Sequence, residues 1–162
     1  MGHKINAFLG YDSTIIRLAE NWSRDSIQLL QGLSMLFLTD SLFEDIMKLS
    51  DLKNKVSVEH FESLTPAILS LLEVYSHRGK IAYFETDYFG GIGEQSAVLF
   101  ENGVLKFPIL YTNDFGIHKN DNERAINSVL KEFGVYKLKG QDEFDSIKLY
   151  RYRNMDKYEK NL

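Results

Sequence analysis

The chain has no cysteine and only two prolines in its 162 residues. The lack of cysteine excludes a disulfide scaffold, a zinc ribbon and a thiol nucleophile, and it fits a cytoplasmic protein. No apolar run approaches the roughly 18 residues that a membrane-spanning helix needs, so we expect no membrane partner. No two histidines have the spacing of a metal motif. We therefore predict neither a metal nor a cofactor.

A surplus of basic residues is also missing. The formal net charge is -4, whereas phosphate binding needs a concentrated basic surface, so we expect no nucleic-acid partner. A chain of this length can bury a core as one domain, and no linker-like stretch divides it. We predict one globular domain over residues 1–150 and a charged, frayed tail over residues 151–162. The oligomeric state stays open.

The apolar spacing predicts an alternation of helices and strands. Helices are expected after Asp12 or Ser13, after Ser41, after Thr65 and after Asp121 or Asn122. Strands are expected over residues 4–9, 33–38, 81–89, 95–100, 104–111 and, as a short piece, 135–138. This order indicates an α+β class: a single two-layer domain, with a mostly antiparallel sheet of about five or six strands backed by helices.

Two helix starts carry capping signals. Ser41 and Glu44 have the spacing of a capping box, in which each side chain bonds a backbone N–H of the first turn. Thr65 precedes Pro66, and a proline at the first helical position loses no hydrogen bond. We expect Ser41 and Thr65 to mark where these helices begin.

The most informative segment lies in the middle of the chain and combines aromatics, acids and glycines. Glycines at this density let the backbone approach a ligand or a partner closely. They follow a predicted strand, but a second strand comes next, where a dinucleotide loop would open a helix. The structural alternative is a wide or bulged hairpin connection. The candidate recognition residues are Glu85, Asp87, Tyr88, Phe89, Gly90, Gly91, Gly93, Glu94 and Gln95.

Carboxylates in this segment are candidates for chemistry. Glu85 and Asp87 point to the same side of an extended strand, roughly 7 Å apart, which suits acid–base or metal chemistry. Glu94 and Gln95 can close around the same point from the other side of the turn. The alternative is a solvated strand end with no site.

A second acidic segment follows near the end of the chain, formed by Asp142, Glu143, Phe144 and Asp145. As a surface, it would present acids around one aromatic anchor, a combination that docks a basic protein. As a structural element, it needs no function, because Asp and Glu belong in a first helical turn.

Residues 81–97 and 142–153 together resemble the central and closing signatures of a group of small, uncharacterised bacterial proteins. The size and one-domain build of that group are similar to immunity proteins of bacterial polymorphic toxin systems, which bind a toxin and block it. The resemblance implies a protein partner and no established activity. The chain departs from the pattern at Lys148 and Tyr152, where a glycine and a histidine are expected.

Two hypotheses of function follow. The first is a non-enzymatic cytoplasmic protein-binding domain, of the kind that inhibits a bacterial toxin as an immunity protein. The alternative is a small ligand-binding domain or enzyme that uses the carboxylates near the glycine-rich turn. Convergence of those carboxylates in a concave site with shifted pKa values favours the alternative.

Overall fold

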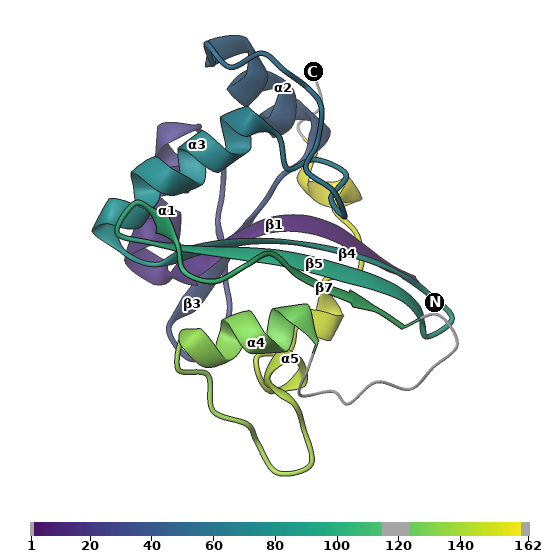
Figure 1. Cartoon of the computed structure of the whole chain (residues 1–162). Coiled ribbons are helices and arrows are strands. Elements are labelled where there is room, and N and C mark those ends of the chain that lie inside the picture. Colours follow the sequence, from purple (N-terminus) through teal and green to yellow (C-terminus); the bar gives the residue numbers. More distant parts are fainter. Residues whose placement is uncertain (1, 115–123, 160–162) are drawn as a thin grey trace.

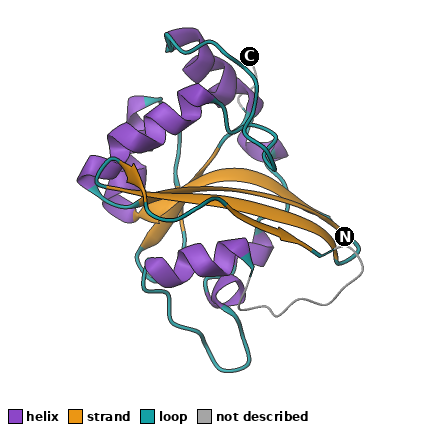
Figure 2. Cartoon of the chain, viewed as in Figure 1, coloured by secondary structure: helices purple, strands orange, loops and turns teal. Residues whose placement is uncertain are grey.

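The computed structural model describes residues 2–114 and 124–159. Within these residues the chain has the predicted α+β fold, with five helices and a seven-stranded sheet (Figure 1 and Figure 2). None of the described helices has both the length and the apolar character of a membrane span. In chain order the elements are β1 (His3–Tyr11), α1 (Asp12–Asn21), β2 (Ile27–Gln28), β3 (Leu33–Phe37), α2 (Asp40–Leu49), α3 (Pro66–Tyr75), β4 (Ile81–Phe89), β5 (Ile92–Glu101), β6 (Val104–Leu105), β7 (Leu110–Asn113), α4 (Ala125–Glu132) and α5 (Glu143–Ser146).

The described sheet is antiparallel throughout, in the order β2-β3-β1-β4-β5-β6, and β7 pairs with the first half of β5. Its longest ladder is the β4–β5 hairpin, which runs from the pair Ile81–Phe100 to the pair Phe89–Ile92. Residues 104–111 were predicted as one strand, but the structure divides them into β6 and β7. Pro108 lies in the break, where its missing N–H cannot contribute to a ladder.

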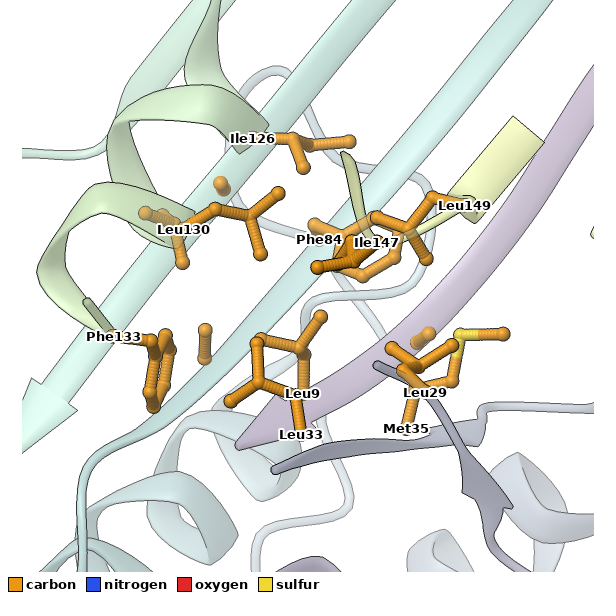
Figure 3. Close-up of a cluster of buried hydrophobic side chains, with 14 of the residues drawn as sticks. Leu9, Leu29, Leu33, Met35, Phe84, Ile126, Leu130, Phe133, Ile147 and Leu149 are labelled. Carbon is orange, nitrogen blue, oxygen red and sulfur yellow. The ribbon is translucent and has the colours of Figure 1, made fainter. Parts of the chain in front are cut away.

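Helices cover both faces of the sheet, whereas the prediction placed them in a single layer. On one side α1, α2 and α3 pack over Tyr83 and its neighbours of the same parity; on the other side α4 and α5 pack over Phe84 (Figure 1). The second core is drawn in Figure 3, where Leu130 and Ile147 lie in one cluster with Phe84. Residues 81–84 are apolar at every position, which is the pattern of a strand buried on both faces.

Of the two helix caps predicted from the sequence, the structure has the one at Thr65 but not the one at Ser41. Thr65 caps α3 and accepts a hydrogen bond from the backbone of Ile68, as predicted. Helix α2 begins one residue before Ser41, and Thr39 is its cap. The carboxylate of Glu159, far along the chain, accepts from the N–H of Asp40 and Ser41 at 3.0 and 2.6 Å. The predicted capping box at Ser41 was therefore wrong.

The C-terminal tail packs on the sheet as far as Glu159, although we predicted that it frays. The carbonyl oxygen of Arg153 accepts from the N–H of Lys4, and the ring of Tyr158 meets Phe37 edge-on at 4.8 Å. Apolar side chains spaced through this charged segment provide the contacts. Residues 135–138, predicted as a strand, are irregular. The predicted helix start at residues 121–122 lies outside the described residues.

Candidate functional site

The glycine-rich segment forms the tip of the β4–β5 hairpin. Gly90 and Gly91 make a two-residue turn between Phe89 and Ile92, with φ of 62° and 79°. Positive φ at both positions is what the turn of a tight hairpin requires, and glycine adopts it without strain. The wide connection that we considered is therefore a tight turn. Phe89 and Ile92 flank it and are 78% and 48% exposed.

One face of the hairpin fixes it to the rest of the fold. The hydroxyl of Tyr88 donates to Asp114 Oδ2 at 2.6 Å, and Gln95 Oε1 accepts from the first turn of α4 at 3.1 Å. Gly93 is buried beneath the ring of Tyr88, with no room for a side chain. Tyr88 is half-buried, and Gly93 and Gln95 are buried, so these three candidates hold the hairpin in place.

The opposite face carries the carboxylates. Glu85, Asp87 and Glu94 line one hollow of about 390 Å³, together with Lys4 and Glu62. Asp87 and Glu94 are directly opposed across the ladder, so their side chains project from the same patch of sheet. When all five groups are ionised, four carboxylates and one ammonium leave a formal charge of -3. We call this hollow, defined by these five residues, the acidic cleft.

Glu85 forms the buried end of the acidic cleft. The residue is 7% exposed, and its carboxylate accepts from the hydroxyl of Tyr83 at 2.6 Å and from the N–H of Ser63 at 2.9 Å. The N–H of Glu62 donates to its other oxygen. Burial raises the pKa of Glu85, and these hydrogen bonds oppose the shift. Glu85 therefore holds the loop around residues 59–64 over the sheet, with its oxygens already engaged.

A lysine already occupies part of the cleft. The ammonium of Lys4 lies 3.3 Å from Glu62 Oε2 and 3.7 Å from Asp87 Oδ2. The hydrogen bond and the charge of Glu62 raise the pKa of Lys4, and Asp87 adds to this effect. All three side chains are more than half exposed, so water screens the pairs and they contribute little to stability.

The outer rim of the acidic cleft orients Glu94. The imidazole of His60 stacks on the ring of Tyr111 with centroids 3.8 Å apart, and the hydroxyl of Tyr111 donates to Glu94 Oε2 at 2.7 Å. Ser96 donates to the carbonyl oxygen of His60, which fastens the loop to β5. The rim therefore holds the Glu94 carboxylate in one orientation at the cleft.

The second acidic segment is a helix start and not a continuous acidic surface. Asp142 caps α5 by accepting from the N–H of Asp145 at 2.8 Å, and it accepts from Asn127 at 2.9 Å. Glu143 is only 2% exposed, and the ring of Phe144 is half-buried. Asp145 alone of the four is exposed. The structural alternative accounts for this segment.

Sequence reasoning missed the residues that close the acidic cleft. Lys4, His60 and Glu62 come from β1 and from a polar loop, and no local spacing links them to β4. The cross-strand pairing of Lys4 with Asp87 is set only by the strand order. Among the described residues, no three His, Asp or Glu side chains are arranged to hold a metal ion.

No protein-family model, curated protein or solved structure matches the chain. The resemblance of residues 81–97 and 142–153 to a bacterial group therefore stays a prediction.

Proposed function

We propose that the chain is a non-enzymatic protein-binding domain that recognises a basic partner through the acidic cleft. The single observation that carries the proposal is the position of Lys4, whose ammonium lies between the carboxylates of Glu62 and Asp87. A lysine or arginine of a partner can replace it there and also reach Glu94. A formal charge of -3 in one hollow raises the rate of encounter with a basic surface and opposes acidic ones.

An apolar contact lies beside the charged one. Phe89 has the same parity as Asp87 on β4, and Ile92 is its partner across the hairpin. Both side chains are exposed, at 78% and 48%, at the tip that extends past the helices in Figure 1. Interfaces combine a central apolar or aromatic anchor with charged groups around it. The tip and the acidic cleft together provide both components on one face.

A cytoplasmic immunity-type inhibitor of a bacterial toxin is the specific form of this proposal. The resemblance over residues 81–97 covers the strand and turn that build the acidic cleft and the tip. An inhibitor needs affinity and no catalytic group of its own, and an acidic face suits a basic toxin surface. Glu85, the most buried carboxylate of the cleft, accepts hydrogen bonds from the backbone of the loop above it.

Affinity capture from cells that naturally express the chain tests the proposal. The wild-type protein is compared with the double variant Asp87→Lys/Glu94→Lys, which reverses the charge of the acidic cleft. The matched control is Glu20→Lys/Glu73→Lys, with the same change of charge at exposed positions on α1 and α3. We expect a stoichiometric protein partner with wild type and control, and its loss with the cleft variant.

Capture that is equal with both double variants would show that the acidic cleft does not bind the partner. If neither double variant retained the partner, binding would depend on net charge alone. This result would also contradict the proposal. Folding of each variant is checked by circular dichroism, because Glu94 accepts a hydrogen bond from Tyr111.

A second function is favoured by the convergence of Glu85, Asp87 and Glu94 in one hollow, where burial raises the pKa of Glu85, and by the size of that hollow. About 390 Å³ falls within the range of small-molecule sites. We propose as the alternative a ligand-binding domain or enzyme that takes a small cationic molecule, with Asp87 and Glu94 as its accessible carboxylates. Titration with 1,4-diaminobutane separates the two functions: saturable binding in the absence of any protein partner favours the alternative.

A further inference from the structure

A second hollow lies on the opposite face of the hairpin from the acidic cleft. It has a volume of about 210 Å³ and is formed where the first residues of β1, the middle of the β4–β5 hairpin, the starts of α4 and α5, and the tail come together. Thr86 and Gln95, which are cross-strand partners, lie in its wall. We call it the basic pocket; the side chains used below are His3, Arg124, Asp142, Phe144, Tyr150 and Arg153.

The charge of the basic pocket is opposite to that of the whole chain. Arg124 and Arg153 line it with one carboxylate, Asp142, in a protein of net charge -4. Arg124 already pairs with Asp114 at 3.6 Å, so Arg153 supplies the positive charge for a ligand. Both oxygens of Asp142 already accept hydrogen bonds within the fold, from Asp145 and Asn127. The side chain of Arg153 is exposed and makes no hydrogen bond or ion pair with another described residue, so its guanidinium is available to a ligand.

Aromatic side chains form much of the remaining wall. The ring of Phe144 meets the imidazole of His3 at 5.4 Å in an edge-on arrangement, and Tyr150 is 44% exposed. Both ring nitrogens of His3 are engaged, with Thr86 at 2.8 Å and with the carbonyl oxygen of Leu149 at 3.3 Å. Burial lowers the pKa of His3, which keeps this wall neutral at pH 7.

We propose that the basic pocket binds a small aromatic carboxylate. The guanidinium of Arg153 presents two parallel N–H donors, which match the two oxygens of a carboxylate. Phe144 and Tyr150 provide ring faces for the apolar body of the ligand. A pocket of about 210 Å³ holds one ring with its acid group. This site does not depend on the proposed function, because it lies on the other face of β4.

An NMR titration of the full-length protein with benzoate tests the proposal. We expect saturable shifts of the backbone amides of His3, Gln95 and Phe144, with no change at Glu62 in the acidic cleft. Benzyl alcohol, which has the ring without the charge, is expected to bind at least tenfold more weakly. Inorganic phosphate, which has charge without the ring, is expected to bind weakly as well.

Two variants locate the contacts. Arg153→Ala should weaken benzoate binding at least tenfold without unfolding the protein, because this side chain has no partner among the described residues. The control Arg78→Ala removes an exposed arginine that does not line the basic pocket and should have no effect. Absence of benzoate binding would overturn the proposal, as would equal binding of benzyl alcohol or equal affinity in Arg153→Ala.

Discussion

The hydroxyl of Tyr83 donates a 2.6 Å hydrogen bond to Glu85 Oε2, and both residues point to the same face of β4. Tyr83 is fully buried in the core beneath α1, α2 and α3. Glu85, two positions further along, is the first polar group on that face. The pair marks the boundary at which the helices leave the sheet and the acidic cleft begins.

Replacing Tyr83 by phenylalanine should destabilise the protein by about 1–3 kcal/mol at pH 7, because a buried carboxylate loses one of its donors. The loss of stability should be smaller at acidic pH, because a protonated Glu85 is neutral and is stabilised less by the Tyr83 hydroxyl. Urea denaturation at pH 7 and pH 4 measures both values. Tyr136→Phe, at a residue that is 66% exposed, is the control. A loss that is the same at both pH values would show that Glu85 is not the acceptor that matters.

The charge of Glu85 should itself reduce stability as pH rises. Burial raises the pKa of Glu85, so the folded protein binds this proton more tightly than the unfolded chain, whose glutamate pKa is about 4.3. The stability of wild type relative to Glu85→Gln should therefore be greatest below about pH 4.3 and fall as pH rises through the folded pKa. Paired denaturation curves from pH 3.5 to pH 8 provide this difference. If the stability of wild type relative to Glu85→Gln grew with pH, the pKa of Glu85 would not be raised by folding.

Substitution of Gly93 should reduce stability much more than substitution of Gly91. A methyl group at Gly93 would lie 2.6 Å from Tyr88 Cα and 2.7 Å from its Cγ, so Gly93→Ala should cost about 1–3 kcal/mol. Gly91 has φ of 79° and open space around it, and asparagine tolerates this conformation, so Gly91→Asn should cost only a few tenths of a kcal/mol. Thermal unfolding compares the two. The nearest obstacles are backbone atoms of the facing strand, Asp87 O and Tyr88 Cα, so equal costs would mean that the two strands can move apart at Gly93.

The tail should stabilise the start of α2. Glu159→Ala removes an acceptor for two N–H groups at a helix N-terminus, which should cost about 0.5–2 kcal/mol. Glu44→Ala is the informative control, since Glu44 would be the acceptor in the capping box predicted from the sequence. Among the described residues, the side chain of Glu44 pairs with Lys55 on the surface. Chemical denaturation measures the loss of stability in each variant. A larger loss in Glu44→Ala than in Glu159→Ala would favour the capping box.

Local patterns in the sequence predicted much of the fold. The bounds of β4 follow from the aromatic and β-branched residues that predominate between Lys80 and the glycine turn, and Pro66 fixed the start of α3. The apolar run at residues 81–84 also indicates burial on both faces of the sheet, although we did not predict from it a second layer of helices. Periodicity reports which faces are apolar, but it does not report which helix covers them.

The candidate site was only partly predictable, because it is assembled over long distances. The shared face of Glu85 and Asp87 follows from strand alternation alone. The contact of Lys4 with Asp87 requires β1 to lie beside β4, and the burial of Glu85 requires the loop at Glu62 to fold over it. Neither has a local signal. The burial of Glu143 likewise has no local signal, since its carboxylate lies 4.0 Å from the ammonium of Lys131 on α4.

Binding of a tetralysine peptide tests the central claim most directly. Its affinity is measured by isothermal titration calorimetry at low salt for wild type, for Asp87→Lys/Glu94→Lys and for Glu20→Lys/Glu73→Lys. If the acidic cleft receives basic side chains of a partner, the cleft variant should bind at least tenfold more weakly than the control, which has the same net charge. Equal affinities of the two double variants would show that the peptide responds to overall charge, and would contradict a specific role for the cleft.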